Sequence, residues 1–586
     1  MTNHLGATAS TLLIYLLLAA SYYGWGGASL RLLRLSDEGP ESPVMPIWIG
    51  WAMTLFLFQL LHLVLPITPS VAIPVFVLGL AFSIPLLWGQ IARLPDGRPS
   101  LLIQATVISF FFLSAVYIAS RAMLPPTNYD SGLYHFNAVR WVNSYPIVPG
   151  LGNLAGRLAF NQSFFVYAAT LNVLPPFEHG RSLANSFLLL LTLATLTPSL
   201  LSIARRPSLL LEEHPFKYAA DLLLLPTIVF LALFSNGLTS PTPDLASTLL
   251  QSVMFVMLAH GLADWLNGRK EQNYRVAILV ILATTAVTIK LSNLAVSAVI
   301  IGFAVAYFYK VSGFSIKGAC RLFLPSTIIL LLWGLRGFIL SGAPLYPSTI
   351  GYASVEWSVP RESVVEMANW IYSWARVPNT QWKSVLGGWG WLHPWFLRMR
   401  AEHMADLIYP LLTASLLCLI TAVVSRFGSM RRPQLLEWSI LLPSTVGLLY
   451  WFLSAPEPRF TNAIVGLAVI SAALLFLLTV RGSVPRWIFL TTFCFLLVAA
   501  DIQPVFYSFQ YRALITVVST SGWQPIPQVP LKSEVTASGL TVYVPVSGDQ
   551  GWDSSLPSTP NFDARLRLIN PADMSSGFTV RNEPGR

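Results

Sequence analysis

The chain has 586 residues, of which 54% are hydrophobic and only 11% are charged. Soluble globular domains carry about 25% charged residues, so this composition excludes a water-soluble enzyme and a nucleic-acid-binding module. The 36 Lys and Arg exceed the 26 Asp and Glu, and the net charge of +10 is typical of membrane proteins with basic cytoplasmic loops. The three cysteines, Cys320, Cys418 and Cys494, lie in apolar surroundings and are interpreted as packing residues.

Apolar segments recur along the chain and predict an all-α polytopic membrane protein. Windows of about 19 residues give about 14 spans, and the count ranges from about 12 to 15 because 276–290 and 294–309 are short. The other predicted spans are 7–27, 45–65, 70–90, 101–120, 183–203, 218–238, 244–264, 322–340, 406–424, 436–453, 460–479 and 487–504. The first has no Lys or Arg before it, which favours a retained span over a cleaved signal peptide.

Lys and Arg in short loops predict the orientation of these spans, because such loops face the cytoplasm. The set of loops that is dense in basic residues contains Arg31, Arg34, Arg93, Arg98, Arg205, Arg206, Lys217, Arg269, Lys270, Arg275, Lys310, Lys317, Arg321, Arg426, Arg431, Arg432, Arg481 and Arg486. We therefore expect this set to be cytoplasmic and both termini to lie outside.

The spans and loops divide the chain into four predicted regions. Residues 1–120 form an N-terminal four-helix membrane segment, and 121–182 form the first external loop. Residues 183–504 form the main bundle, which includes a second external loop, 341–405. Both loops are rich in Trp and Tyr and predict short helices at the membrane interface. Residues 505–586 form an external cap, in which Gly539–Val546 is β-like.

The densest group of polar residues follows the fourth predicted span. It consists of Tyr129, Asp130, Tyr134, His135, Arg140, Arg157 and Asn161. A carboxylate, a histidine and arginines confined between lipid and water favour a binding or catalytic site on the outer membrane surface. The alternative is a helix cap at Asp130 followed by a helix that lies on the surface.

Two more charged residues stand at the outer ends of predicted spans. Asp244 follows a Pro-x-Pro turn at the start of a span, where its alternative role is that of an N-cap. Lys290 lies between two apolar runs. The alternative to a role in the site is that its side chain only extends the ammonium group to the membrane interface.

Three further charges and one tyrosine complete the candidate set. Arg336 is embedded in the apolar run 331–340 and needs an anionic or carbonyl partner, and Tyr346 follows shortly after it. Glu457 and Arg459 share a short loop, in which the alternative is that they pair only with each other. The predicted topology places all of these charges on the outer side, so we expect them to surround one cavity.

Carboxylates beside fixed cations suit the transfer of a group from a lipid-linked phosphate to a hydroxyl. An acid can act as general base while Lys or Arg neutralises the departing phosphate. The chain contains no Walker loop and no Gly-x-Gly-x-x-Gly that opens a helix after a strand, so nucleoside triphosphates are not expected.

The first external loop resembles that of the GT-C superfamily of integral-membrane glycosyltransferases, which includes protein O-mannosyltransferases and the lipid A aminoarabinose transferase. The residues that carry the resemblance are Asp130, Tyr134, Ala138, Trp141, Pro146–Pro149 and Phe160–Phe165. The resemblance implies a polyprenyl-phosphate sugar donor, with Asp130 as catalytic base or acceptor-positioning acid and Asp244 as a second acid. Lys290, Arg336 and Arg459 match the phosphate-binding cations by role and side of the membrane.

The sequence departs from that family pattern in two ways. About four spans precede the acidic loop instead of one, which indicates an N-terminal addition. Asp130 is followed by Ser131 where many members have a second acid, which leaves a divalent metal open as the only cofactor. The tail around Trp552 and Asp553 is similar to a largely uncharacterised family of bacterial membrane proteins, although Gly551 and Ser558 replace two cysteines of that motif.

The sequence therefore predicts a glycosyltransferase of the bacterial plasma membrane with its active site on the extracytoplasmic side. Its expected partners are the lipid-linked donor, an extracytoplasmic hydroxyl acceptor on a glycan, lipid or protein, and membrane lipids, but no nucleic acid. Two alternatives stay open, namely a lipid-linked-oligosaccharide flippase or other transporter, and a polysaccharide polymerase or ligase. A transporter is expected to have paired halves or broken helices at the midplane, whereas this chain places its charges on one face.

Overall fold

The structure is a computed structural model that describes residues 2–33, 44–91, 101–175, 178–268, 273–313, 315–427, 431–480, 483–507 and 522–580. Six of the basic residues that predicted the orientation lie outside the described residues: Arg34, Arg93, Arg98, Arg269, Lys270 and Arg481. Residues 508–521 and 581–586 of the predicted cap also lie outside them.

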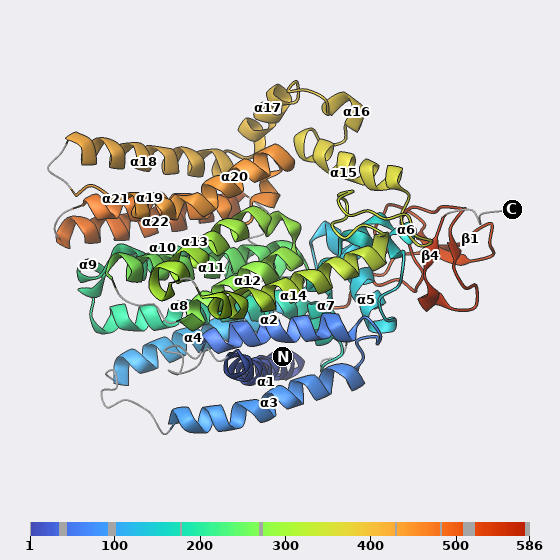
Figure 1. Ribbon diagram of the computed structural model, residues 1–586, viewed down its shortest axis with the longest axis horizontal. Helices are drawn as coiled ribbons and strands as arrows, with labels where there is room; N and C mark the ends of the chain where they lie inside the picture. The colour runs from blue at the N-terminus through green and yellow to red at the C-terminus, as the bar shows by residue number, and fades with distance from the viewer. Residues whose placement is uncertain are drawn as a thin grey trace.

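Long apolar helices dominate the described residues (Figure 1). They are α1 (Thr2–Leu32), α2 (Val44–Leu61), α3 (Pro69–Ile91), α4 (Leu101–Ala122), α8 (Leu183–Arg205), α10 (Pro215–Phe234), α11 (Pro243–Leu266), α12 (Asn273–Ile289), α13 (Leu294–Ser312), α14 (Ile316–Ser341), α18 (Tyr409–Phe427), α20 (Leu442–Ser454), α21 (Ile464–Thr479) and α22 (Ser483–Tyr507). In the described residues, eleven helices are long and apolar enough to cross a membrane, and three shorter apolar helices cover Arg275–Ile289, Ile464–Thr479 and Pro485–Val498. The chain is an all-α polytopic membrane protein, and the exact number of spans stays a prediction.

Burial separates the centre of the bundle from its edge. In the most apolar 18-residue stretch of α11, 89% of the residues are buried, whereas in that of α18 only 17% are buried. A helix that is apolar all round can be covered by other helices on every side, while a helix at the edge of a membrane protein exposes its apolar residues to lipid. The centrally placed α11 therefore sets the position of the residues at its two ends.

The predicted N-terminal addition packs tightly on itself and on the main bundle. A Cβ atom at Gly50 of α2 would lie 1.7 Å from the carbonyl oxygen of Tyr22 of α1, so only glycine permits this close approach. The hydroxyl of Tyr15 donates to Ser186 Oγ of α8 at 2.6 Å. These contacts connect α1 and α2 to the helices that carry the candidate site.

Three segments meet at one end of the bundle, which we call the loop end. The first contains α5 (Phe136–Ser144), α6 (Leu151–Leu154) and α7 (Phe164–Asn172), and the second contains α15 (Arg361–Arg376), α16 (Trp382–Val385) and α17 (Leu392–Glu402). The third is the C-terminal segment 522–580 (Figure 1). Asn153 Nδ2 joins all three, because it donates to the carbonyl oxygens of Trp357 at 2.9 Å and Phe578 at 3.0 Å.

The C-terminal segment contains two small antiparallel sheets. In the first, β1 (Leu531–Val535) pairs with β2 (Thr541–Pro545), from Leu531 opposite Pro545 to Val535 opposite Thr541. In the second, β3 (Arg567–Leu568) pairs with β4 (Phe578–Thr579). β2 falls within the stretch 539–546 that the sequence predicted to be β-like. Neither sheet is large enough to be stable alone, so the segment depends on its contacts with the loops below it.

Candidate functional site

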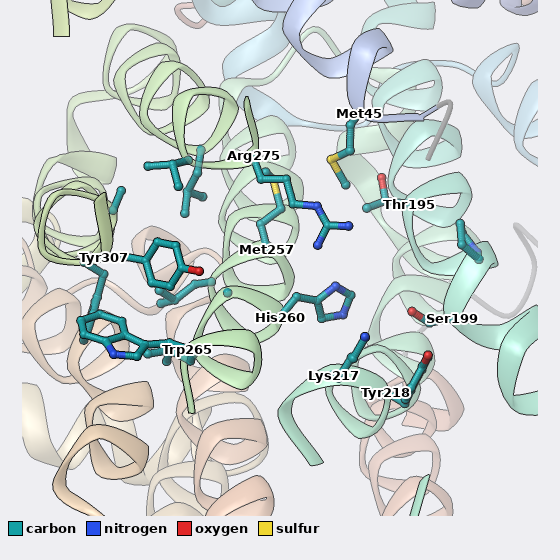
Figure 2. A pocket seen from close by; sticks show the side chains of 18 of the residues that line it. Met45, Thr195, Ser199, Lys217, Tyr218, Met257, His260, Trp265, Arg275 and Tyr307 are labelled. Carbon is teal, nitrogen blue, oxygen red and sulfur yellow. The ribbon is translucent and has the colours of Figure 1, made fainter. Parts of the chain in front are cut away.

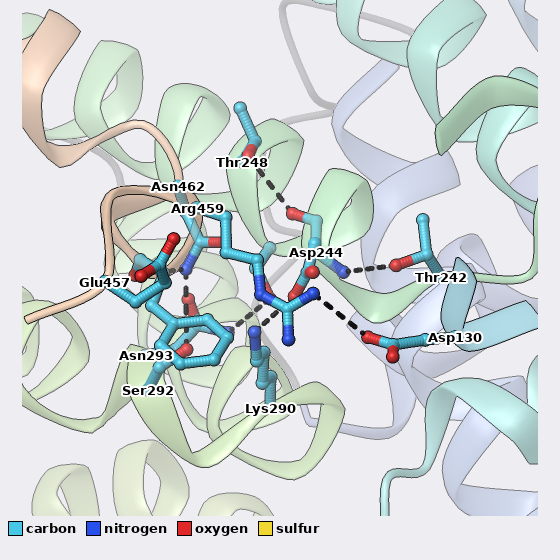
Figure 3. Close-up of polar contacts among 12 residues, drawn as sticks. Asp130, Thr242, Asp244, Thr248, Lys290, Ser292, Asn293, Glu457, Arg459 and Asn462 are labelled. Atoms are coloured by element: carbon cyan, nitrogen blue, oxygen red, sulfur yellow. Dashed lines mark hydrogen bonds and ion pairs between the residues drawn. The ribbon is translucent and has the colours of Figure 1, made fainter. Parts of the chain in front are cut away.

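Asp130 stands at the start of a short π-helix, Ser131–His135, at the loop end. Its carboxylate oxygen Oδ2 lies 3.4 Å from Nη1 of Arg459, which comes from the turn between α20 and α21 (Figure 3). The backbone N–H of Asp130 donates to Asn128 Oδ1 at 3.0 Å, so the turn before the π-helix fixes the backbone of the acid. π turns are rare and frequently occur at functional sites.

Asp244 and Lys290 form the second ion pair of the site, through Asp244 Oδ1 and Lys290 Nζ. The alternative role of Asp244 as an N-cap is wrong, because Thr242 is the N-cap residue of α11 and accepts from the Asp244 N–H at 3.3 Å. The Asp244 carboxylate is therefore available to the site. Figure 3 shows the Lys290 side chain pointing toward Asp244 and the Arg459 side chain pointing toward Asp130.

A buried amide network explains why these separate segments meet. Gln251 of α11 donates to Asn293 Oδ1 at 2.8 Å and accepts from the Ala463 N–H at 3.0 Å. Asn293 in turn donates to Ser247 Oγ at 3.0 Å. Gln251 and Asn293 are fully buried, so an unmade hydrogen bond in this network would be costly. The network ties the turn that carries Lys290 and the turn after Arg459 to the helix that carries Asp244.

Two aromatic rings hold the cations. Lys290 Nζ lies 4.7 Å and the guanidinium carbon of Arg459 lies 4.9 Å from the centre of the Phe460 ring. The same carbon of Arg459 lies 4.9 Å from the Trp374 ring of α15. Cations are attracted to aromatic faces, so these rings orient both side chains without neutralising their charge.

Burial and nearby charges shift the pKa values of Tyr134 and His135 in the π-helix. Burial, followed by the charges of Asp130 and Asp244, raises the pKa of Tyr134 well above its usual value, so its hydroxyl stays protonated and can donate a hydrogen bond. Burial lowers the pKa of His135 to about 4, against the opposing effect of the two carboxylates. His135 is therefore neutral near pH 7, and its buried Nδ1 has no hydrogen-bond partner among the described residues.

A cavity of about 420 Å³ lies beside the π-helix. Tyr134, Asn153 and Arg157 form part of its wall, and residues 560–565 of the C-terminal segment form the opposite part. Tyr134 belongs both to this wall and to the electrostatic surroundings of Asp130, so the cavity lies close to the charged cluster, although none of the cluster's four charged residues lines the cavity.

Arg336 has partners other than the charged cluster. Its Nη1 contacts the Gln59 carbonyl oxygen at 3.2 Å and His62 Nδ1 at 3.0 Å. It lines a small cavity of about 50 Å³ together with Arg157 and Asn161. The carbonyl partner that a buried guanidinium requires is thus supplied by α2, and within the described residues no hydrogen bond or ion pair joins Arg336 to Asp130 or Asp244.

Glu457, Asn161 and Tyr346 make contacts within the protein. Glu457 pairs with Arg398 of α17 at 2.9 Å, so the alternative that it pairs with Arg459 is wrong. Asn161 Nδ2 donates to the Trp333 carbonyl oxygen at 2.6 Å, and the backbone carbonyl oxygen of Asn161 accepts from Trp333 Nε1 at 2.7 Å. The Tyr346 ring is buried and lies 6.0 Å from the Phe160 ring.

Tyr129 and Arg140 contact the C-terminal segment. Tyr129 Oη donates to Asp549, and Arg140 Nη1 lies 3.4 Å from Asp553 Oδ1. The buried Arg181 also contacts Asp553, at 2.6 Å. The backbone N–H of the neighbouring Trp552 donates to the carbonyl oxygen of Gly132, a residue of the π-helix, at 2.8 Å. The tail motif that the sequence singled out therefore attaches this segment to the candidate site.

A second polar cavity, of about 200 Å³, lies elsewhere in the bundle (Figure 2). Lys217, His260 and Arg275 line it, and His260 Nε2 contacts the buried Asp221 at 2.6 Å. His260 follows Asp244 by 16 positions on α11, which places the two about 24 Å apart along the helix axis. None of the residues that the sequence proposed for the site lines this cavity.

No group of three or more His, Cys, Asp and Glu side chains that could hold a metal ion occurs in the described part of the chain. Asp130 and Asp244 each pair with a cation and do not share a position for a metal ion.

The residues that sequence reasoning missed are polar or aromatic side chains inside or beside spans. They are Gln251, Asn293, Trp374, Phe460, Arg398 and Arg181. Gln251 had a usable signal, because an amide in the middle of an apolar span needs a partner. The others gave no comparable signal, since their partners lie far away in the chain.

The fold and the site define a multi-pass membrane protein with a cluster of paired acids and cations at one end of its helical bundle. Residues 9–466, more than half of the chain, match the family described as Domain of unknown function (DUF8201), and the chain belongs to that family. No curated protein and no solved structure matches the chain.

Proposed function

We propose that this protein transfers a sugar from a polyprenyl-phosphate-linked donor to a hydroxyl acceptor, on the extracytoplasmic side of a bacterial plasma membrane. The observation that carries the proposal is the meeting of two carboxylates and two cations from four separate segments: Asp130, Asp244, Lys290 and Arg459. Charges in a membrane protein are costly, and those that face a cavity mark sites of binding or chemistry.

In this reaction the acceptor hydroxyl gives its proton to Asp130 while its oxygen forms a bond to the anomeric carbon of the donor sugar. The bond from that carbon to the phosphate oxygen breaks, and the electron pair leaves with the polyprenyl phosphate. Arg459 and Lys290 stabilise the charge that develops on this leaving group. The products are the glycosylated acceptor, the polyprenyl phosphate and the protonated acid.

The two ion pairs support different roles. The side chain of Arg459 is 45% exposed and lies 3.4 Å from Asp130, so this pair contributes little to stability and can exchange partners. If the donor phosphate takes Arg459, the Asp130 carboxylate is released from its ion pair and can accept a hydrogen bond from the acceptor hydroxyl. The side chains of Lys290 and Asp244 are less exposed, at 15% and 28%, so this ion pair holds the turn that carries Lys290 against the start of α11.

The cavity beside Tyr134 and Arg157 supports access for the acceptor. Tyr134 keeps its proton, because burial and the nearby carboxylates raise its pKa, and it can donate a hydrogen bond to an acceptor oxygen. Donor and acceptor would then approach Asp130 from the two sides of the π-helix.

The test is sugar transfer by the Asp130→Asn variant. The purified protein in liposomes is supplied with the lipid-linked sugars and the envelope glycans of the cells that make it, and released polyprenyl phosphate is measured. We expect at least a ~100-fold lower rate for Asp130→Asn, and an unchanged rate for Glu402→Gln, which removes an exposed acid of α17. A folded Asp130→Asn variant with the full rate would reject the role of this acid.

A further inference from the structure

α15 and α16 enclose a wide groove of about 1030 Å³ at the loop end. The residues that matter for its chemistry are Trp370, Trp374, Trp382, Asn369, Asn379 and Gln381. Three indole rings therefore line the same groove as three amide side chains. None of these residues belongs to the acids and cations proposed for sugar transfer.

Two tryptophans connect the groove to the candidate site. Trp374 lines the groove, and its ring lies 4.9 Å from the guanidinium carbon of Arg459, which contacts Asp130. Trp370 lies 5.0 Å from the guanidinium carbon of Arg157, which lines the cavity beside Tyr134. A ligand in the groove thus lies next to both parts of the candidate site.

The aromatic rings are available to a ligand. The rings of Trp370 and Trp374 lie 6.4 Å apart with an angle of 23° between their planes, so they form one aromatic surface. Trp370 is 43% exposed, although a residue of this size is usually well buried. Arg157 lies over one face of the Trp370 ring and Arg459 over one face of the Trp374 ring. The indole surface of Trp370 that stays exposed can bind a molecule with an apolar face.

We propose that this groove binds a saccharide chain, which is the acceptor of the reaction. A pyranose ring has a face of C–H groups that packs on the negative face of an indole ring, and hydroxyls at its edge that bond to amides. The groove offers both kinds of group side by side, and its Trp374 contacts Arg459, the partner of Asp130. The assignment of the saccharide as acceptor rests on the proposed function, whereas the binding of the saccharide to the groove does not.

The composition of the groove favours a saccharide over lipid. Glu362, Glu366 and Asn369 stand among the tryptophans of the groove. Hydrocarbon tails cannot satisfy carboxylates and amides, whereas the hydroxyls of a sugar chain can donate to them and accept from them.

The experiment measures binding and transfer separately. The full-length protein in lipid nanodiscs is immobilised and exposed to the soluble glycan fraction released by mild acid from the envelopes of the cells that make it. We expect Trp370→Ala to lower the retained glycan about tenfold, which is the loss of one well-packed aromatic contact and its hydrogen bonds. Trp389→Ala is the matched control, because Trp389 is 61% exposed in the same segment and does not line the groove.

Asp130→Asn distinguishes the failure of this inference from the failure of the proposed function. We expect it to retain the glycan as well as the wild type while its rate of sugar transfer falls at least ~100-fold. Two results would overturn the saccharide groove and leave the proposed function standing. One is equal glycan retention by Trp370→Ala and the wild type. The other is a wild type that retains no glycan but still transfers sugar to a lipid or a protein. Strong quenching of a dye at Asn379→Cys by brominated lipid tails would show that the groove holds lipid and would also overturn it.

Discussion

The Arg459 guanidinium lies 3.4 Å from the Asp130 carboxylate, although 329 positions separate the two residues in the chain. The contact joins the turn before α21 to the π-helix after α4. Because Arg459 also packs on Trp374 and Phe460, its position is fixed by aromatic rings even when its ion pair opens. A guanidinium with this freedom can bind a phosphate without moving its backbone.

Replacing Lys290 by Met is expected to destabilise the protein by about 1–3 kcal/mol, because Asp244 then lacks its cationic partner in a poorly solvated place. The double variant Lys290→Met with Asp244→Asn should recover part of this loss. The thermal unfolding of the single and double variants in detergent measures the coupling. Additive effects of the two substitutions would show that the pair makes no energetic contribution.

Replacing Gln251 by Met should cost about 2 kcal/mol, because Asn293 Oδ1 and the Ala463 N–H lose a buried partner. The variant should also lower sugar transfer, since the turns with Lys290 and Arg459 lose a common anchor. Thr106→Val on α4 is the control, because Thr106 is exposed. A variant with normal stability and normal transfer would contradict an anchoring role for Gln251.

The spans could be predicted from the sequence because each needs only about 20 consecutive apolar residues, which is a local property. The charge pattern of the loops similarly placed Asp130, Asp244, Lys290 and Arg459 in one group, and the structure brings these four together. The pairing itself could not be predicted, because it depends on how distant helices pack. The sequence therefore grouped Arg336 with the site, whereas its observed partners are Gln59 of α2 and His62, which follows the end of α2.

Asp553 is expected to hold the C-terminal segment on the π-helix mainly through Arg181. The side chain of Arg181 is 2% exposed and that of Arg140 is 39% exposed, so only Arg181 is left as a buried charge when Asp553 is replaced by Ala. Limited proteolysis should cut the Asp553→Ala variant faster in its C-terminal segment. Arg140→Ala should cost less than about 1 kcal/mol and leave the cleavage rate nearly unchanged. Faster cleavage of Arg140→Ala than of Asp553→Ala would refute this order.

His135 should make the protein less stable at acidic pH. Burial lowers its folded-state pKa from 6.5 to about 4, so the unfolded chain binds a proton that the folded protein does not bind in this interval. Stability is therefore complete above about pH 6.5 and falls toward pH 4, by up to about 1.4 kcal/mol for each pH unit. His135→Gln should fall less over this range in thermal unfolding measured at several pH values, whereas the exposed His393→Gln should follow the wild type. Parallel curves for all three proteins would show that His135 has no such role.

The central claim is that Arg459 and Lys290 bind the phosphate of a polyprenyl-phosphate lipid beside Asp130. Native mass spectrometry of the detergent-solubilised protein with added polyprenyl phosphate tests it most directly. The account predicts a bound lipid in the wild type and in Asp130→Asn, and at least a tenfold weaker complex in Arg459→Ala and Lys290→Ala, with Arg400→Ala as an exposed control. Equal lipid binding by the wild type and both site variants would contradict it.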